Sequence, residues 1–509
     1  MSPDTIAQRL EAACHRWGRR NALTFLRNRG PETTLTYQQL DSEINRCAHM
    51  LVDRGIGKGE RVILLIDKCL FAVVAHFALL RIGAIAVPLN PGFKRGELAY
   101  LIGDADPALT ITAPDKTALI RKIDPRVPIF TVDPRVPYQD LALFDESQAS
   151  VPDREIEPQD PGLIIYTSGT TGNPKGAVLT HGNLLHDADT IIGAWRISAS
   201  DVLCHALPLF HIHGLCFALH TCLLSGAHVR LLHRFDATAV LAELSATPFD
   251  SPCTVFMAVP TMYAKMMASL AGAPRRFDHL RLLTSGSAPL LVSEFERIES
   301  VFGQRPVERE GMSETGMNFS NPIAGERKPG SIGLPLPGVK VRVVDPQTGR
   351  EVTRGKVGEL WLKSLSITPG YWRKPRETEA AFAQGWFKSG DLGYVDSDGY
   401  YYLTDRIKHI IITGGENVSA KEVETVINQL EAVAESSVVG IPDDKWGEKV
   451  VAAVVLNPGA QLTADRIRDH CKENLHAWKC PKAVVFVSAI PRNTMGKMLK
   501  EAVKALFAS

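Results

Sequence analysis

The 509-residue sequence predicts an α/β protein with a large N-terminal domain of layered α/β subdomains, residues 1–404, and a small α+β C-terminal domain, residues 405–509. A chain of this length exceeds what one hydrophobic core supports, so two or more domains are expected. In the first part, short apolar runs typical of buried strands alternate with helical patterns, as in a parallel sheet covered by helices. Beyond residue 405 the predicted strands and helices form a unit of roughly a hundred residues, which is small for a domain.

The alternation begins with a helix that follows residue 36. Thr36 and Gln39 have the spacing of a capping box, apolar residues follow at helical intervals, and Gly55 ends the helix. The elements expected next in the first part are a helix at 71–80 and strands at 62–66, 84–88, 109–112, 129–132 and 163–165. Those expected in the second part are a helix from residue 421, a helix at 463–474, and strands at 409–413, 438–439, 450–455 and 483–487.

Composition excludes several classes of function. Hydrophobic content of 45%, charged content of 22% and a formal net charge of +1 are ordinary for a soluble globular protein, and they give no reason to expect nucleic acid or an anionic membrane as a partner. The nine cysteines are scattered and form no C-x-x-C pair, so neither a disulfide framework nor a zinc site is expected, and a cytoplasmic location is predicted. The N-terminus lacks the apolar segment of a signal peptide, and charged residues interrupt the most apolar stretch, 62–89, so no integral membrane segment is expected.

The stretch 166–176 is the first concentration of functional residues. It holds four Ser/Thr hydroxyls, three glycines and one lysine, directly after the strand expected at 163–165. Glycines let the backbone approach an anion, hydroxyls add donors and lysine adds positive charge, so the stretch predicts a polyphosphate-binding loop rather than a flexible linker. It is not a Walker A loop, because the G-x-x-x-x-G-K-[ST] string is absent. The residues expected to bind phosphate are Thr167, Ser168, Gly169, Thr170, Thr171, Gly172 and Lys175.

Two histidines two residues apart, His211 and His213, form the second concentration. As metal ligands they would need a third partner, and none is evident nearby in the sequence, so we expect them to line an apolar pocket instead.

The third concentration of functional residues is the string 308–315, in which an acid, Glu314, follows a small hydroxyl, Ser313. Glu314 suits Mg²⁺, because hard cations take carboxylates together with substrate phosphates; the alternative is a solvated surface acid. A serine elbow, G-x-S-x-G, would need glycine at position 315, where Thr315 stands, so a hydrolase is disfavoured. Further along, Asp391 lies in a glycine-framed turn that suits a sugar diol, and Lys497 lies on a glycine-containing loop near the C-terminus.

Together and in this order, the motifs resemble the series shared by the AMP-forming acyl-CoA synthetases, from about residue 10 to the C-terminus. The resemblance implies an ATP-dependent carboxylic acid:CoA ligase that works through an acyl-adenylate and forms acyl-CoA, AMP and pyrophosphate. Its cofactors would be ATP, Mg²⁺ and CoA. It also implies that the C-terminal domain is mobile, with Lys408 at the hinge.

The resemblance gives each matching residue a role. The catalytic residues would be Lys497, Glu314, Ser313 and His211, with Lys497 bridging the substrate carboxylate and the α-phosphate. Glu314 would bind Mg²⁺, with Thr170 as a weaker ligand. The nucleotide and cofactor residues outside the phosphate loop would be Ser287, Glu310, Gly311, Met312, Asp391, Arg406, Gly414 and Gly415, with Asp391 and Arg406 at the ribose. The residues for the acid would be His211, His213, Arg234, Arg281, Ser285, Gly286 and Met317.

Three positions depart from the family pattern. Glu310 stands where an aromatic residue usually stacks on adenine, Ser313 replaces a threonine, and Ala420 replaces a common proline. Glu310 matters most, because a carboxylate cannot stack on adenine: it would either weaken nucleotide binding or hydrogen-bond the exocyclic amine instead.

Four strings, at 205–215, 285–291, 313–322 and 491–497, most resemble malonyl-CoA synthetases, which predicts malonate or a related short dicarboxylate as the acid. A second carboxylate in a pocket needs a cation, and Arg281 and Arg234 are the candidates, with His211 and His213 as lesser donors. The alternatives are that Arg281 is shared with monocarboxylate ligases and that Arg234 is a solvated strand end.

Other functions stay open at this point. One is a medium-chain fatty or aryl acid CoA ligase of fatty acid metabolism. Another is an adenylation module that loads a carrier protein, although such modules have Phe-Asp where this chain has Phe210 and His211. A luciferase-type oxygenase has no mark in the sequence. The expected partners are the acid, ATP and CoA, and the expected oligomeric state is monomer or dimer.

Overall fold

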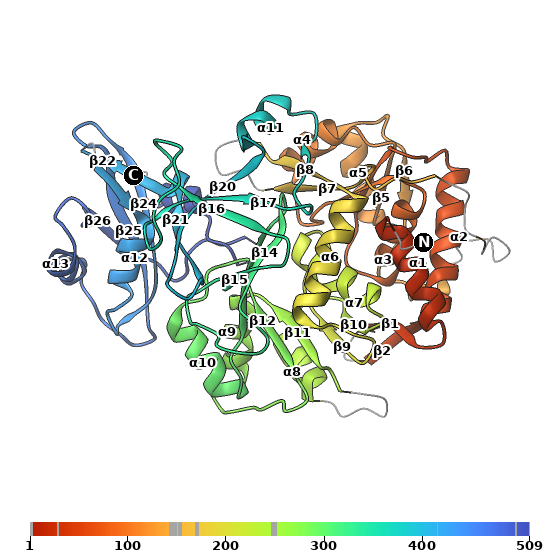
Figure 1. The fold of residues 1–509 in the computed structure, drawn as a ribbon, viewed down its shortest axis with the longest axis horizontal. Helices are drawn as coiled ribbons and strands as arrows, with labels where there is room; N and C mark the ends of the chain where they lie inside the picture. Colours follow the sequence, from red (N-terminus) through yellow and green to blue (C-terminus); the bar gives the residue numbers. More distant parts are fainter. Residues whose placement is uncertain are drawn as a thin grey trace. The chain divides into compact units, whose positions relative to one another are not determined.

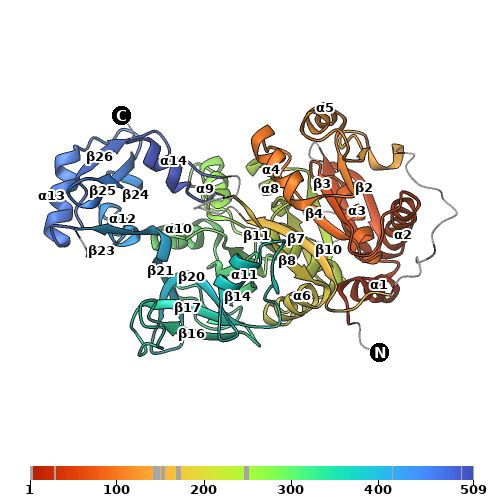
Figure 2. The same cartoon turned by 90° about the horizontal axis from the view of Figure 1, so that it is seen from above.

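The computed structural model describes residues 4–27, 30–141, 150, 155–167, 173–245, 252–414, 416–493 and 496–507. The chain forms two compact units (Figures 1 and 2). The first comprises Met1–Lys340 with Lys363–Phe387, and the second comprises Val341–Leu362 with Lys388–Ser509. Both units mix helices and sheets, which confirms the predicted α/β class with a large N-terminal part and a smaller C-terminal part. The boundary predicted between residues 404 and 405 falls inside the second unit.

A nine-stranded sheet carries much of the first unit, in the order β15-β14-β13-β12-β11-β9-β10-β1-β2. Its strands are β1 (Asn21–Arg27), β2 (Gly30–Thr36), β9 (Val202–His205), β10 (His228–Leu232), β11 (Val255–Ala258), β12 (Leu282–Ser285), β13 (Val307–Met312), β14 (Gly316–Ser320) and β15 (Leu334–Pro335). The six strands from β1 to β13 along this order are parallel, so their carboxyl ends meet at one edge, where ligands of such sheets bind.

A seven-stranded sheet forms the other part of the first unit, in the order β18-β8-β7-β4-β3-β5-β6. Its strands are β3 (Arg61–Leu65), β4 (Ile85–Pro88), β5 (Leu109–Thr112), β6 (Ile129–Thr131), β7 (Pro161–Thr167), β8 (Lys175–Thr180) and β18 (Gly370–Tyr371). The strands predicted at 62–66, 84–88, 109–112, 129–132 and 163–165 are all confirmed within this sheet.

Helices cover these sheets and largely follow the predicted pattern. The principal ones are α1 (Ile6–Trp17), α2 (Tyr37–Asp53), α3 (Leu70–Arg81), α4 (Arg95–Ala105), α5 (Pro114–Ile123), α6 (His181–Trp195), α8 (Ala237–Ser245), α9 (Pro260–Ser269) and α10 (Val292–Phe302). The capping box predicted for α2 is present: Gln39 N donates to Thr36 Oγ1 at 3.2 Å, and Thr36 N donates to Gln39 Oε1 at 2.8 Å.

One helix has a winding that the sequence did not predict. Residues His213–His220 form the π-helix η2, in which every residue is buried, and it runs into the short helix α7 (Thr221–Leu224). Gly214 lies so close to Pro208 that a Cβ atom there would be 2.1 Å from its carbonyl oxygen, so only glycine fits. At the other end, His220 Nε2 lies 2.8 Å from Nε2 of His76, which projects from the fully buried helix α3.

The second unit contains two sheets. One has the order β16-β17-β20-β19 with β21 on β20; its strands are β16 (Lys340–Val344), β17 (Gly358–Lys363), β20 (Trp386–Val395), β21 (Tyr401–Arg406) and β19 (Phe382–Ala383), the last of which falls in the first unit by its residues. The other has the order β23-β22-β25-β24 with β26 on β25; its strands are β22 (Ile410–Thr413), β23 (Glu416–Ser419), β24 (Val433–Asp443), β25 (Gly447–Leu456) and β26 (Ala483–Phe486). The strands predicted at 438–439, 450–455 and 483–487 belong to it.

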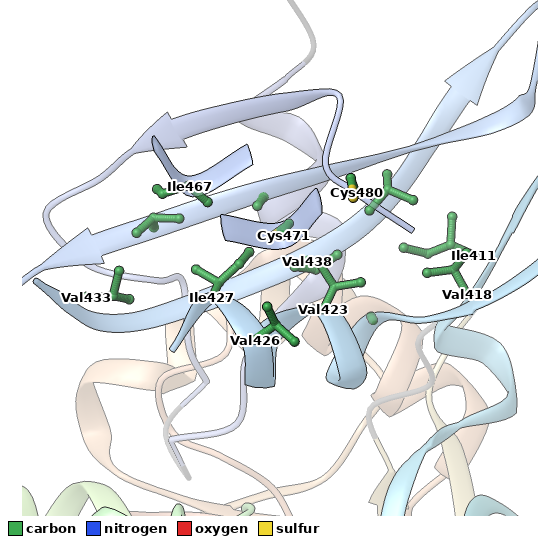
Figure 3. Close-up of a cluster of buried hydrophobic side chains, with 14 residues drawn as sticks. Ile411, Val418, Val423, Val426, Ile427, Val433, Val438, Ile467, Cys471 and Cys480 are labelled. Carbon is green, nitrogen blue, oxygen red and sulfur yellow. The ribbon is translucent and has the colours of Figure 1, made fainter. Parts of the chain in front are cut away.

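Helices pack on both faces of this second sheet. Val450, Ala452 and Val454 face a core shared with α12 (Ala420–Ile427) and α13 (Ala464–Asn474), drawn in Figure 3. The intervening residues Val451 and Ala453 face a smaller core shared with α14 (Lys500–Ala505). The alternation follows from the two-residue period of a strand, and it explains why β25 is apolar throughout.

Acid should destabilise the protein through its buried histidines. Burial lowers the pKa of His76 to about 3 and that of His181 to about 4. An unfolded histidine titrates near ~6.5, so below that pH the unfolded chain binds more protons than the folded one. The free energy of unfolding should therefore fall between pH 6.5 and 4 by roughly 1.4 kcal/mol per pH unit for each such histidine. Urea unfolding at pH 7, 6 and 5 measures this slope. His76→Gln should reduce it, whereas the same change at the exposed His15 should not. An unchanged slope in His76→Gln would contradict the assignment.

Candidate active site

Two antiparallel strands, β7 and β8, flank the predicted phosphate loop. β7 and β8 run antiparallel with Thr167 opposite Lys175, and Thr167 Oγ1 donates to Lys175 O at 3.3 Å. Gly176 packs against Ile164, where a Cβ atom would be 2.7 Å from Ile164 Cγ2, so the base of the hairpin requires glycine. The predicted residues Ser168, Gly169, Thr170, Thr171 and Gly172 lie outside the described residues.

Tyr371 connects the base of this hairpin to Glu314. Strand β18 pairs with β8, and Lys175 Nζ lies 5.0 Å from the centre of the Tyr371 ring. The Tyr371 hydroxyl donates to Glu314 Oε1 at 3.1 Å. Burial, and then the Glu314 charge, raise the pKa of Tyr371, which therefore stays a neutral donor. A cation, a phenol and a carboxylate from three distant segments thus lie together in the first unit.

The environment of Glu314 fits a role toward Mg²⁺ with a phosphate substrate. It is 8% exposed, which contradicts the alternative of a solvated surface acid. Among the described residues, no group of three or more His, Cys, Asp and Glu side chains is arranged to hold a metal ion. A single carboxylate is what Mg²⁺ requires when substrate oxygens and water fill its other positions.

A second cluster lies at the carboxyl ends of β12 and β13. The backbone of Ser287 is left-handed, with φ +67, and its Oγ lies 3.1 Å from Nδ1 of His213. Arg309 Nη2 donates to the same oxygen at 3.4 Å. Gly286 lies under the guanidinium, where a Cβ atom would be 2.6 Å from Arg309 Nε. The predicted residues Gly286, Ser287 and His213 are therefore brought together, around an arginine that was not predicted.

Arg309 is buried without the partners that such burial normally demands. It is 2% exposed, and neither Nε nor Nη1 has a hydrogen-bond partner among the described residues. Its guanidinium lies 5.1 Å from the ring centre of Phe217. Burial lowers the pKa of Arg309 to about 10, so it still carries its charge at neutral pH. Buried donors of this kind are available to an acceptor from a bound ligand or water.

The two histidines are neutral in this environment. Burial lowers the pKa of His211 to about 4, and burial followed by the charge of Arg309 lowers the pKa of His213 far below its usual value. His213 Nε2 has no hydrogen-bond partner among the described residues. This cluster therefore offers a permanent cation, Arg309, and uncharged imidazoles beside it.

The structure contradicts the prediction that Arg281 binds substrate. Arg281 Nε and Nη2 donate to the two carboxylate oxygens of Asp201 at 2.7 and 2.6 Å. Its remaining contacts are to the carbonyl oxygens of Trp195 and Arg196 at 3.0 and 2.9 Å. It also precedes β12, whereas Ser285 ends that strand, so the two lie roughly 13 Å apart along the extended chain. Arg281 ties α6 to the amino end of the sheet.

Arg234 is likewise not joined to the cluster. It is exposed and lies just after β10, and no described contact links it to Ser287, His213 or Arg309. Its position fits the alternative given for Arg234 in the sequence analysis, a solvated strand end.

The remaining predicted residues of the first unit lie on the hairpin of β13 and β14. Glu310 is half-buried and accepts a hydrogen bond from Asn318 Nδ2 at 3.0 Å. Gly311 has no room for a side chain, because a Cβ atom would be 2.8 Å from Gly316 O. Met317 is buried, and its backbone N–H donates to Asp187 Oδ1 at 2.8 Å. Met312 and Ser313 are half-buried at the turn, and Ser285 is fully buried.

In the second unit, Asp391 and Arg406 form a buried ion pair. Arg406 Nε lies 2.5 Å from Asp391 Oδ1, across the pairing of β20 and β21. Burial raises the pKa of Asp391, while the charges of Arg406, Lys497 and Lys408 pull it down. The predicted ribose acid and the predicted catalytic lysine are therefore electrostatic neighbours within one unit. Lys497 is half-buried on a turn closed by Asn493, and Lys408 is exposed.

Gly414 lies against an exposed tryptophan that the sequence reading did not single out. Gly414 has φ +61, and its N–H donates to Trp446 O at 2.7 Å. The Trp446 ring is 38% exposed, with Lys445 Nζ 5.0 Å and Lys482 Nζ 5.9 Å from its centre. An open aromatic face between two lysines suits a purine that carries phosphates. Gly415 lies outside the described residues.

Comparison with known proteins identifies relatives over the full length. Residues 10–372 match the AMP-binding enzyme family, and residues 422–497 match the AMP-binding enzyme C-terminal domain. The chain is 36% identical to the mitochondrial malonate–CoA ligase of Bos taurus over 87% of this chain and 80% of that protein. It is 33% identical to the oxalate–CoA ligase of Arabidopsis thaliana over 100% of this chain and 99% of that protein. The crystal structure of ATP-bound MatB from Rhodopseudomonas palustris aligns with a TM-score of 0.91 and 36% identity, covering 98% of this chain and 99% of that one.

No helix among the described residues is long and apolar enough to cross a lipid bilayer.

Arg281→Met tests the reassignment of that residue. Loss of the pair with Asp201, whose carboxylate is 2% exposed, should lower the free energy of unfolding by about 1–3 kcal/mol, discounted because Arg281 is itself 36% exposed. Selectivity between malonate and butyrate, measured as the ratio of kcat/KM, should stay unchanged. A collapse of that ratio in a variant that remains folded would restore the substrate role.

Proposed function

We propose that this chain, which belongs to the AMP-binding enzyme family and is an ATP-dependent, AMP-forming acid–CoA ligase, acts on malonate or a related short dicarboxylate. The observation that carries this proposal is Arg309, a buried cation with two unpartnered donor atoms beside Ser287 and His213. Names of two relatives, a malonate ligase and an oxalate ligase, give it independent support.

The reaction has two steps because a carboxylate is a poor electrophile. Its leaving group would be oxide, so the carboxylate first attacks the α-phosphorus of ATP and releases pyrophosphate. The thiolate of CoA then attacks the acyl carbon of the adenylate, and AMP leaves. Two anions must meet in the first step, so positive charge is needed where negative charge accumulates on phosphorus.

Each site residue then has a proposed task. The hairpin from Thr167 to Lys175 binds the β- and γ-phosphates, and Ser313 and Glu314 act at the α-phosphate. Glu314, together with phosphate oxygens of the substrate, would hold Mg²⁺, which would supply positive charge where the carboxylate approaches. Tyr371 keeps the Glu314 carboxylate in place through its hydrogen bond.

The proposed ribose-binding residues and the proposed catalytic lysine belong to the second unit. Asp391, oriented by Arg406, accepts the ribose hydroxyls, and Lys497 bridges the substrate carboxylate and the α-phosphate. The charge of Lys497 lowers the pKa of Asp391, which supports this assignment because the ammonium must then lie near the acid that would hold the ribose. Lys408 is the proposed hinge, at the boundary of the proposed mobile domain, residues 405–509. Gly414, with Trp446, contributes to CoA binding.

Arg309 explains why a dicarboxylate is favoured over a monocarboxylate. Its planar guanidinium binds a carboxylate through two parallel hydrogen bonds, and Nε and Nη1 are available for this. A monocarboxylic acid with an apolar tail would leave those donors buried and unpaired. Such a penalty selects against the wrong substrate more strongly than a missing methylene does.

We further propose that the enzyme works in the cytoplasm as a monomer or dimer. The scattered, buried free cysteines are consistent with a reducing compartment. Light scattering of the purified protein distinguishes the two oligomeric states.

Lys497→Ala should abolish ATP-dependent adenylation, by roughly 10²–10³-fold or more, because a charge used in that transition state is lost. Thioester formation from supplied acyl-adenylate should remain largely intact. Pyrophosphate release measures the first step, and thioester formation from synthetic malonyl-adenylate measures the second. Equal loss in both steps would show that Lys497 does not act in adenylation alone.

Malonate should exceed butyrate by roughly 10²–10⁴ in kcat/KM for the unmodified enzyme. A panel of malonate, oxalate, succinate, butyrate and octanoate, scored by AMP formation, tests this. Arg309→Met should shrink the ratio mainly by loss of malonate, with Arg281→Met as the matched control. If butyrate or octanoate is preferred by the unmodified enzyme, the dicarboxylate proposal is wrong and the acid–CoA ligase assignment alone remains.

A further inference from the structure

Helix α4 contacts the chain on both sides of the proposed phosphate loop. Tyr100 and Asp104 lie four residues apart on this helix and therefore on one of its faces. Asp104 Oδ2 accepts a hydrogen bond from the Tyr166 hydroxyl, on β7, at 2.8 Å. The Tyr100 hydroxyl donates to the carbonyl oxygen of Pro174, just before β8, at 2.9 Å. Since the apolar face of α4 is buried in the core of the seven-stranded sheet, these contacts tie both ends of the loop to a rigid element.

These contacts lie next to the described residues assigned to phosphate binding. Tyr166 directly precedes Thr167, and Pro174 directly precedes Lys175. Thr167 and Lys175 are opposite each other in the pairing of β7 and β8. A shift of either strand end would therefore carry a proposed phosphate-binding side chain with it.

The other oxygen of Asp104 binds a third segment. Lys374 Nζ lies 2.8 Å from Asp104 Oδ1, and the Asp104 side chain is 7% exposed. Lys374 follows β18, and its backbone N–H donates to Tyr371 O at 3.2 Å. Tyr371 in turn donates to Glu314, the proposed Mg²⁺ ligand. The two oxygens of one largely buried carboxylate thus connect the start of the phosphate loop with the turn that carries the hydrogen-bond donor to Glu314.

The chemistry of Asp104 suits this double contact. An ionised carboxylate accepts from a phenol and an ammonium at once, whereas an amide offers one oxygen and one donor group. Burial, and then the hydrogen bond to Asp104, raise the pKa of Tyr166, so its hydroxyl is a neutral donor. The neighbouring acid Asp106 makes a comparable pair with Arg373 at 2.8 Å, but its side chain is 61% exposed. Solvent screens a pair at the surface more than a buried one, so the contacts of Asp104 should fix the geometry more firmly than those of Asp106.

Adenylation uses these placements, whereas thioester formation does not. In the first step charge moves onto the departing pyrophosphate, so the rate depends on where the phosphate-binding residues and the Mg²⁺ ligand lie. In the second step pyrophosphate has already left. We propose that Asp104 is a positioning residue of the adenylation step, which sets the placement of the phosphate loop relative to Glu314. The inference rests on the proposed function for the roles of Thr167, Lys175 and Glu314, and it holds whichever acid is the substrate.

Asp104→Asn tests the inference in the full-length enzyme. The amide cannot accept from both Tyr166 and Lys374, so kcat/KM for ATP in ATP–pyrophosphate exchange should fall by roughly 10–10²-fold. Thioester formation from the supplied adenylate of the preferred acid should stay near that of the unmodified enzyme. Asp106→Asn is the matched control, because it removes a carboxylate two residues further on, whose pair with Arg373 joins the end of α4 to the same turn. Both half-reactions should be unchanged in this control.

Two further variants separate the possible outcomes. Tyr166→Phe removes only the hydroxyl and should also impair exchange while sparing thioester formation; combined with Asp104→Asn, it should cost less than the product of the two single losses, because both remove the same contact. Lys175→Ala should impair exchange through the proposed phosphate contact itself. Equal loss of both half-reactions in Asp104→Asn would overturn the inference. So would unimpaired exchange in the folded Asp104→Asn and Tyr166→Phe variants while Lys175→Ala is impaired, and these results leave the proposed function intact. Unimpaired exchange in Lys175→Ala would overturn the phosphate assignment of the proposed function, and the inference with it.

Discussion

A guanidinium buried at the carboxyl end of a parallel sheet is the constraint on which the site of the first unit depends. Arg309 is 2% exposed, so its charge must be balanced by what surrounds it. The neighbouring chain is shaped accordingly: Gly286 has no side chain over the guanidinium, Ser287 takes a left-handed backbone to present its hydroxyl, and Phe217 offers its ring face. Each feature would be costly elsewhere, and together they hold a cation that is charged, rigid and short of acceptors.

The acids near Arg309 matter as much as the arginine. Glu310 occupies a position where the family usually has an aromatic residue, and its carboxylate both accepts from Asn318 and raises the pKa of Arg309. Asp187 adds a second negative charge from another element. Two carboxylates, those of Glu310 and Asp187, therefore act on the charge of Arg309, and Glu310 itself stands at a position of the family motif.

Much of the fold follows from local sequence, whereas part of the site does not. The capping box at Thr36, the buried strands of the seven-stranded sheet and the hairpin of the phosphate loop each carry a periodic or turn signal of their own. The prediction for Arg281 rested on its closeness in sequence to the turn after Ser285. Strand β12 lies between them, so Arg281 and that turn are at opposite ends of the strand. Arg309 and Tyr371 were missed because their importance comes from neighbours contributed by other segments. The sequence signal for Arg309 was its position in strand β13, where the structure shows that Val307, Glu308 and Arg309 are all buried.

The π-helix η2 has a consequence for how this enzyme's specificity could change. The hydrogen bonds of a π-helix span five residues rather than the four of an α-helix, and the two ends of η2 are fixed here, by Ser287 at His213 and by His76 at His220. Loss of a single residue between those anchors would turn the residues after it by roughly 100° about the helix axis relative to those before it. The contact of Ser287 with His213 and that of His76 with His220 could then not both be kept. A deletion of one codon in η2 would therefore change the acid-binding site coarsely, whereas substitutions around this helix would change it only finely.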